Sequence, residues 1–372
     1  MAMIDGFFDV PKEAVSELEI EVVETEEGCR VASKAGDLFE IVNGAPPDVR
    51  RNPTLYSVFV CQTEHTGELD TRPLLDSTLG KTVGYVFPVT AFRGGEAIDG
   101  TWPRRFADIG FRHATQLPIL SEFGAAISIS AIRDRKVYLD EVFNDDLSIA
   151  VLSNDARDAL AVAPDTLELM LFKQGIEIVH SRFDIRSDPP ALSGLTAARL
   201  IKPGPLVAGE ATVFLSLFKS ADRDQTGVGA FLHLYQALEF CIDHIFGWDV
   251  TRIGHDTSLD TWAMKEQLSR ITGETYRLSL LDARFLRALP SRAPLNQLAQ
   301  ACSNFLKALE IEFETDAPWF KLLYKSRNII VHNQMKMMKA TSVPLRDLIT
   351  TLREAAIEIL FYFSMSEQIQ AA

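Results

Sequence analysis

Arg327, Asn328 and His332 are the residues of this chain whose types and spacing best suit chemistry. Histidine moves protons near neutral pH, and arginine presents a rigid, permanently charged fork that matches the oxygens of a phosphate. Asn328 lies four residues before His332, so both fall on one face of a helix, where the amide would orient the imidazole or hold a phosphate oxygen. The pattern therefore predicts a site that binds an anion and transfers a proton.

The segment around these residues is basic, although the whole chain is acidic. Between Lys321 and Leu345 there is no aspartate or glutamate, while the formal net charge of the 372 residues is −14. The basic residues of this segment are Lys321, Lys325, Arg327, Lys336 and Lys339. We predict that Tyr324, Lys325 and Lys336 contact the substrate, with Lys336 acting through its charge. A solvated helix face is the alternative explanation for the lysines at 321, 336 and 339.

The six residues Arg327-Asn-Ile-Ile-Val-His332 resemble the Arg-x4–6-His motif of the HEPN superfamily, in which a polar residue commonly follows the arginine. Residues 234–239 (LYQALE) resemble an early-helix signature of several HEPN nucleases, including those near the ApeA-like branch. The resemblance covers about residues 210–370 and implies a helical bundle with the motif on a late helix. It also implies that Glu239 faces the active site, with Tyr235 as a second supporting residue. Packing or an ion pair is the simpler interpretation of both.

The function that this resemblance implies is metal-independent RNA cleavage. HEPN nucleases make the 2′-hydroxyl of RNA attack the adjacent phosphate, and two protomers bring their motifs together. We therefore expect an endoribonuclease, a homodimer, products ending in a 2′,3′-cyclic phosphate, and a role as a bacterial toxin or in antiviral defence. His332 would be the general acid/base, and Arg327 would stabilise the transition state. The sequence has no metal-ligand motif, so neither a metal nor a cofactor is expected.

Two other interpretations stay open. A HEPN bundle can serve only for dimerisation or partner docking, and such a protein would not cut RNA. Arg327 would then be a structural arginine paired with a carboxylate such as Glu239, and His332 a satisfied core histidine or a cation at a helix end. The third possibility is an enzyme whose active site lies in residues 1–200, where no motif is readable.

The chain around this motif falls into parts of different composition. Residues 1–187 carry short β-branched and aromatic runs between Gly, Asn and Asp clusters, which predicts a β-rich mixed domain. Residues 188–209 are rich in proline and glycine and predict a linker. Residues 210–372 have apolar residues at three- and four-residue steps, which predicts an all-α bundle. The expected fold class is therefore α+β.

The first domain is expected to consist mainly of strands. The predicted strands are Leu18–Val23, Ser57–Cys61, Thr82–Val89, Ala126–Ile132, Leu147–Leu152, Leu167–Phe172 and Gly175–Ser181. One helix is predicted at Asp155–Ala163.

Five helices are expected in the second domain. The first has an apolar face formed by Phe231, Leu234, Leu238, Ile242 and Ile245. The second and third span Leu259–Ile271 and Leu295–Leu309. The fourth carries the motif, with Asp316 as its cap and Pro318 in its first turn. The fifth opens at Ser342 and Pro344 and carries an apolar stripe of Leu345, Leu348, Leu352 and Ile359.

Charge and composition bound the partners and the compartment. Residues 1–200 hold 19 basic and 32 acidic side chains, whereas residues 201–372 hold 18 and 19. The first part would repel nucleic acid, so we expect it to regulate activity and to receive a trigger or a partner. Four scattered cysteines without a Cys-x-x-Cys pair predict reduced, buried thiols. No long apolar run and no basic amino-terminal region are seen, which predicts a cytoplasmic protein without a membrane segment.

Overall fold

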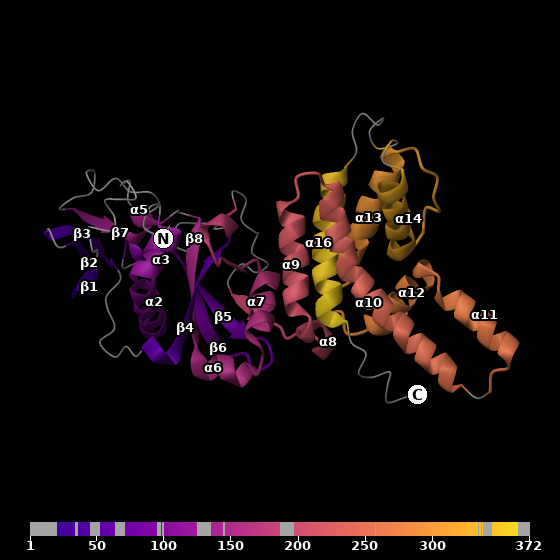
Figure 1. Cartoon of the computed structure of the whole chain (residues 1–372), viewed down its shortest axis with the longest axis horizontal. Helices are drawn as coiled ribbons and strands as arrows, with labels where there is room; N and C mark the ends of the chain where they lie inside the picture. Colours follow the sequence, from indigo (N-terminus) through magenta and orange to yellow (C-terminus); the bar gives the residue numbers. More distant parts are fainter. Residues whose placement is uncertain are drawn as a thin grey trace. The chain divides into compact units, whose positions relative to one another are not determined.

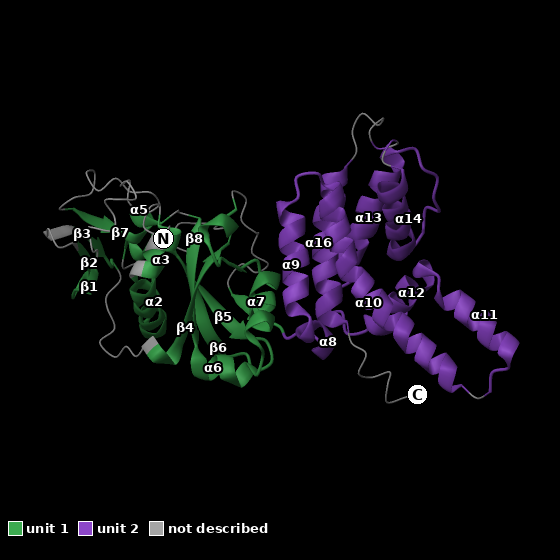
Figure 2. Cartoon of the chain, in the orientation of Figure 1, with its two compact units in different colours: residues 1–201 green, residues 202–372 purple. Residues whose placement is uncertain are grey.

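The computed structural model of the chain describes residues 21–33, 36–44, 53–63, 71–94, 98, 100–124, 135–143, 146–186, 197–256, 258–333, 335, 337 and 344–363. The chain divides into two compact units, residues 1–201 and 202–372 (Figures 1 and 2). The first unit contains two sheets and the second is helical, so the predicted α+β fold class is confirmed. The boundary lies inside the predicted 188–209 linker. Part of that segment, Ala198–Leu200, is nevertheless a strand, β10, of the first unit.

The larger sheet of the first unit has the strand order β10-β5-β6-β8-β4-β9. Its other strands are β4 (Tyr56–Gln62), β5 (Arg72–Asp76), β6 (Thr82–Pro88), β8 (Leu147–Ser153) and β9 (Glu177–Ile178). The pairs are antiparallel except β10 with β5, which is parallel. Three predicted strands, Ser57–Cys61, Thr82–Val89 and Leu147–Leu152, are confirmed as β4, β6 and β8. Residues 147–152 of β8 are all buried, as expected of a strand at the centre of a sheet covered on both faces.

The smaller sheet has the order β1-β2-β3-β7. Its strands are β1 (Glu21–Glu24), β2 (Gly28–Ser33), β3 (Gly36–Val42) and β7 (Lys136–Tyr138). The predicted strand Leu18–Val23 overlaps β1, and its first three residues lie outside the described residues, as does the whole of Ala126–Ile132.

Short helices complete the first unit. They are α2 (Thr101–Ala114), α3 (Leu117–Phe123), α5 (Leu139–Val142), α6 (Asn154–Leu160) and α7 (Pro164–Lys173), with 3-10 turns η1 (Pro53–Leu55), η2 (Val89–Phe92) and η3 (Arg182–Asp184). The helix predicted at Asp155–Ala163 is confirmed as α6 up to Leu160, and Ala161, in the left-handed conformation, ends it three residues earlier than predicted. The strand predicted at Leu167–Phe172 is wrong, because these residues belong to α7, which starts with Pro164 in its first turn. The run is buried almost throughout, and a short apolar run has no period that distinguishes helix from strand. The strand predicted at Gly175–Ser181 is reduced to the two residues of β9.

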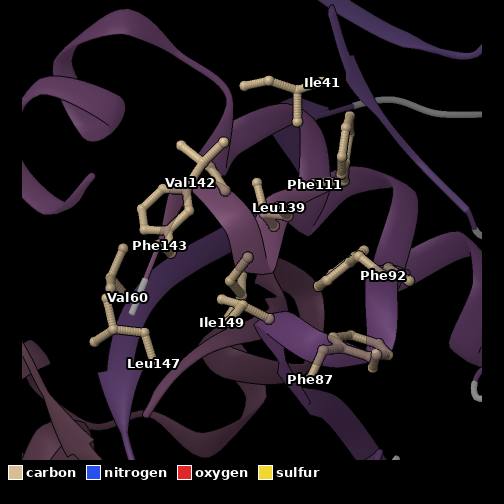
Figure 3. Packing of buried hydrophobic residues seen from close by; sticks show 14 of the residues in the cluster. Ile41, Val60, Phe87, Phe92, Phe111, Leu139, Val142, Phe143, Leu147 and Ile149 are labelled. Carbon is tan, nitrogen blue, oxygen red and sulfur yellow. The ribbon is translucent and has the colours of Figure 1, made fainter. Parts of the chain in front are cut away.

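The two sheets and α2 share one hydrophobic core. Figure 3 shows Ile41 of β3 and Phe111 of α2 together with Phe87 and Ile149 of the larger sheet. Each of these four side chains is at most 2% exposed. Burying a side chain of this size contributes about 1.5–3 kcal/mol, so this cluster holds the first unit together.

The second unit is a bundle in which α10 is the longest helix (Figure 1). Its helices are α8 (Pro205–Gly209), α9 (Ala211–Arg223), α10 (Val228–His255), α11 (Thr261–Ile271), α12 (Glu274–Leu280) with a π-helical turn η4 (Leu281–Phe285), α13 (Ala293–Ala308), α14 (Trp319–His332) and α16 (Leu345–Tyr362). Helix α10 packs on α9 and α16, and α13 packs on α16 and α14. The motif helix α14 is therefore connected to the other helices of the bundle mainly through α13, and it also packs on α12.

The predicted helices of this unit are confirmed with some corrections. The five apolar residues predicted for the first helix are all buried in α10, and the other four predictions correspond to α11, α13, α14 and α16. Helices α8, α9 and α12 were not predicted, so the motif helix is not the fourth of the unit. The cap at Asp316 is wrong, because α14 begins after Pro318 without a side-chain cap. On α16, Leu348, Leu352 and Ile359 are buried and Leu345 is half-buried, whereas Ser342 lies outside the described residues.

The four cysteines, Cys29, Cys61, Cys241 and Cys302, are buried and free, as predicted. Burial raises the pKa of the Cys61 thiol and that of the Cys302 thiol to about 12, so neither is a ready nucleophile at neutral pH. Over the part of the chain that the structure describes, no helix combines the length and the apolar character that crossing a membrane requires.

Candidate active site

Helix α14 places Arg327 beside its buried face and His332 at its end. The buried residues of the helix are Trp319, Leu322, Leu323, Ser326 and Ile330. They follow the three- and four-residue steps that put one face of a helix against a core. The indole Nε1 of Trp319 donates to Asp282 Oδ1 at 2.8 Å and fixes the start of the helix. Arg327 is 24% exposed, and His332, the last helical residue, is exposed.

The three motif residues contact one another. Arg327 Nη1 donates to Asn328 Oδ1 at 3.3 Å and lies 3.5 Å from His332 Nε2. A guanidinium group can only donate, so a hydrogen bond between these two atoms requires Nε2 to be the acceptor nitrogen of the imidazole. Asn328 was predicted to orient the imidazole or to hold a phosphate oxygen; in the structure its amide oxygen accepts a hydrogen bond from the guanidinium of Arg327.

Both predicted supporting residues lie on α10 next to Arg327. Glu239 Oε1 is 3.9 Å from Arg327 Nη2, and the Tyr235 ring centroid is 5.8 Å from the guanidinium carbon. Tyr235 is 2% exposed, so its ring is held in place by the surrounding core. The Glu239 side chain is 41% exposed. An ion pair that is long and exposed contributes little to stability, roughly 0–1 kcal/mol. If Arg327 is a structural residue it needs a carboxylate partner, and Glu239 is that partner, although at 3.9 Å the ion pair is weak.

Helix α12 adds two residues that the sequence did not reveal. Glu274 accepts a short hydrogen bond from Tyr235 Oη, and Arg277 Nη1 lies 3.3 Å from Asp243 Oδ1 of α10. Burial and the Glu274 carboxylate raise the pKa of the Tyr235 phenol well above its usual value, so this hydroxyl stays protonated and donates. Asp243 follows Tyr235 and Glu239 at four-residue steps, a spacing that sequence analysis could have used. The α12 residues lie more than 30 positions away and have no such signal.

The electrostatics of the site centre on Glu239. Partial burial raises the pKa of its carboxyl group, and the Glu274 and Asp243 carboxylates raise it further. The guanidinium groups of Arg327 and Arg277 act in the opposite direction without cancelling the rise. The site thus contains three carboxylates, those of Glu239, Glu274 and Asp243, but only two guanidinium groups. Glu239 therefore takes up a proton more readily than an ordinary glutamate.

This charge imbalance predicts the pH dependence of stability. The pKa of Glu239 is higher in the folded than in the unfolded chain, so its ionised form is disfavoured by folding. Ionisation of Glu239 therefore lowers the free energy of unfolding. This loss is absent at pH values below the ordinary pKa of glutamate, and it grows as the pH rises through the pKa of Glu239 in the folded chain. We expect Glu239→Gln to melt at a higher temperature than the parent at pH 7, with the two curves meeting near pH 4. Differential scanning fluorimetry between pH 4 and pH 8 measures this.

The matched control for that measurement is Glu266→Gln, which removes an exposed carboxylate from α11. It should leave the pH dependence of the melting temperature unchanged. A Glu239→Gln protein that melts below the parent at pH 7 would mean that the ion pair with Arg327 outweighs the other carboxylates.

The predicted substrate-binding residues are only partly placed at this site. Tyr324 and Lys325 are half-buried on α14. Lys325 Nζ donates to the carbonyl of Glu312, so in this structure it ties the helix to the segment that follows α13. Lys321 is 3.3 Å from Glu314. Lys336 lies outside the described residues.

The first unit contains a separate cavity of about 540 Å³. It lies between the larger sheet and α6 and α7, and its lining includes Phe59, Arg157, Glu168 and His180. His180 Nε2 and Glu168 Oε2 are 3.0 Å apart. The cavity has the size of a small-molecule site and combines an apolar floor with charged groups.

Within the described residues, no group of three or more His, Cys, Asp or Glu side chains is placed to hold a metal ion. Comparison of the chain with models of protein families, with curated proteins and with solved structures finds no match. The candidate site is therefore defined by the motif residues and by the side chains that contact them.

Proposed function

We propose that this chain is an endoribonuclease of the HEPN type. The observation that carries the proposal is the position of the Arg327 guanidinium, which contacts the His332 imidazole at 3.5 Å and the Glu239 carboxylate at 3.9 Å. A phosphodiester bound to this guanidinium would have a proton-transfer group on either side. RNA cleavage by its own 2′-hydroxyl needs two such groups, one to remove a proton and one to supply it.

In the proposed reaction, the bound phosphate replaces His332 Nε2 as the acceptor of the Arg327 Nη1 hydrogen bond. The electron pair on Nε2 of the neutral imidazole is then free to take the proton of the 2′-hydroxyl. The 2′ oxygen forms a bond to phosphorus while the bond from phosphorus to the 5′ oxygen breaks. Protonated Glu239 gives its proton to the leaving 5′ oxygen. Arg327 stabilises the extra negative charge of the phosphorane, as a preorganised cation does where charge develops. The products are a 2′,3′-cyclic phosphate and a 5′-hydroxyl, and no metal takes part.

The proposal extends to partners and setting. We place the protein in the cytoplasm as a homodimer joined through residues 202–372, with a toxin or antiviral role. The first unit would regulate cleavage. Its excess of acidic residues disfavours RNA binding, and its 540 Å³ cavity offers room for a small-molecule trigger.

One observation favours a second candidate function, a bundle that only docks partners. Arg327 stacks on Tyr235 and pairs with Glu239, so it joins α14 to α10 as a structural arginine would. In that case His332 is simply the exposed cation at the end of a helix.

An RNA cleavage assay separates the two functions. We expect the purified 372-residue chain to cut total RNA in buffer containing EDTA, since Arg327 and His332 supply the charge and the proton transfer. The products should carry 2′,3′-cyclic phosphates, detected because phosphatase removes the terminal phosphate only after acid opening of the ring. Intact RNA after prolonged incubation, with or without EDTA, would favour the docking function. RNA cut only when a divalent metal is added would rule out the proposed mechanism.

A further inference from the structure

Two arginines from different helices face one stripe of α10. The stripe consists of Tyr235, Glu239, Asp243 and Phe246, whose steps of four, four and three residues place them on one helix face. Arg327 of α14 meets the stripe at Tyr235 and Glu239. Arg277 of α12 meets it one turn further on, at Asp243 and Phe246.

Both guanidinium groups are held in place by aromatic rings. The guanidinium carbon of Arg327 is 5.8 Å from the Tyr235 centroid, and that of Arg277 is 5.3 Å from the Phe246 centroid. The arginine side chains are only 24% and 17% exposed. A guanidinium group within about 6 Å of a ring centroid is attracted to the ring and keeps N–H groups that can donate to a phosphate. The two cations are therefore preorganised.

The carboxylates that pair with these arginines are much less confined. Glu239 is 41% exposed and Asp243 is 77% exposed, at 3.9 Å and 3.3 Å from their arginines. Exposed ion pairs of this kind are weak and are screened by salt. A phosphate can accept two hydrogen bonds from one guanidinium fork and so competes well with such a carboxylate. In the free protein each carboxylate thus occupies the place of a phosphate.

The α10 residues that the two arginines contact are spaced along the helix like neighbouring phosphates of a nucleic acid strand. Glu239 and Asp243 are four residues apart, which is about 6 Å along a helix axis. Neighbouring phosphates along one strand of RNA are separated by a similar distance. A duplex would have to bring a second strand to the same stripe, whereas a single strand needs only to follow it.

We propose that Arg277 binds the phosphate next to the scissile one, so that the site takes single-stranded RNA with at least two phosphodiesters. This inference rests on the proposed function, in which Arg327 binds the scissile phosphate. Asp243 then competes with RNA for Arg277, and its removal strengthens binding.

Steady-state cleavage of random dinucleotide and trinucleotide pools by the full chain tests the proposal. A dinucleotide has one phosphodiester and a trinucleotide has two. We expect Arg277→Gln to raise KM for the trinucleotides about tenfold more than for the dinucleotides, with similar kcat, because one charge-assisted contact is lost. Arg270→Gln is the matched control. Arg270 lies on the neighbouring helix α11 and stacks on Tyr276 at 5.0 Å, so both pools should be cut as by the parent.

Binding of a fluorescein-labelled 2′-O-methyl trinucleotide pool, which has no 2′-hydroxyl for attack, gives a second readout. Fluorescence anisotropy at several KCl concentrations should show a salt slope shallower by about 0.7 for Arg277→Gln, the value for one phosphate contact on a single strand. Asp243→Asn should bind the trinucleotide pool more tightly than the parent. This variant tests the proposal if Arg277→Gln does not fold.

The outcomes of the two readouts are distinct. If the parent protein cuts RNA and Arg277→Gln raises KM equally for the dinucleotide and trinucleotide pools, Arg277 does not bind the second phosphate, but the proposed nuclease function stands. A parent that cuts no RNA contradicts the proposed function, and the salt slope then still decides on Arg277. Unchanged slopes in Arg277→Gln and unchanged binding in Asp243→Asn overturn the assignment.

Discussion

His332→Ala is expected to lower the rate of RNA cleavage by about 100-fold or more, the scale of a lost general acid/base. The imidazole is the group that accepts the 2′-hydroxyl proton in the proposed reaction, and no other histidine contacts Arg327 among the residues that the structure describes. Because His332 is exposed at the last position of α14, its removal should leave the bundle folded. Single-turnover cleavage of a labelled RNA, with circular dichroism to verify the fold, measures the effect.

His255→Ala is the matched control, since His255 is also exposed and is the last residue of its helix, α10. It should cut RNA at the parental rate. A folded His332→Ala protein that is as fast as His255→Ala would remove the nuclease assignment from this site.

The helices of the second unit could be predicted because their apolar residues recur over long stretches. The five apolar residues of α10 span 15 positions and were all found to be buried. Helices α8 and α12 are too short to give a comparable signal, whereas α9 has 13 residues with Phe214, Leu215 and Phe218 buried at helical steps and was nevertheless missed. Helix α12 has seven residues, too few for a helical period to be recognised in the sequence.

The first unit was harder to predict because its elements are short and buried on several sides. Helix α2 contains Pro103 and Gly110, which normally argue against a helix. Pro103 lies in the first turn, where its missing N–H costs little. A Cβ at position 110 would lie 2.9 Å from a methyl group of Val151, so the glycine lets α2 approach β8 closely. The residue that looks like a helix breaker is thus explained by packing between segments far apart in the sequence.

The candidate site likewise combines contacts within one helix with contacts between segments that are far apart in the sequence. The contacts among Arg327, Asn328 and His332 are local, so one helix and its spacing predict them. Glu239 and Tyr235 were predicted to lie near the site because residues 234–239 resemble an early-helix signature. The structure places both side chains beside Arg327. Glu274 and Arg277 reach the site only because α12 packs against α10 and α14. Residues brought together by tertiary packing leave no pattern within a short stretch of sequence.

Arg327→Ala is expected to lower the cleavage rate by about 100- to 1,000-fold, the range found when one preorganised donor to a transition-state oxyanion is removed. Arg327→Lys should recover only part of this loss. An ammonium group keeps the charge but lacks the planar fork that donates two parallel hydrogen bonds to a phosphate. The kcat of both variants, with KM for a trinucleotide pool, measures the effect.

Lys321→Ala is the matched control for Arg327, because it removes an exposed cation from the same helix. Its kcat should equal that of the parent. The melting temperatures decide between catalysis and structure. If Arg327 mainly joins α14 to α10, Arg327→Ala should lose stability and Arg327→Lys should restore it together with any activity. If Arg327 stabilises the transition state, Arg327→Lys should fold as stably as the parent and still be slow, because the lost interaction forms fully only when charge develops on the phosphate.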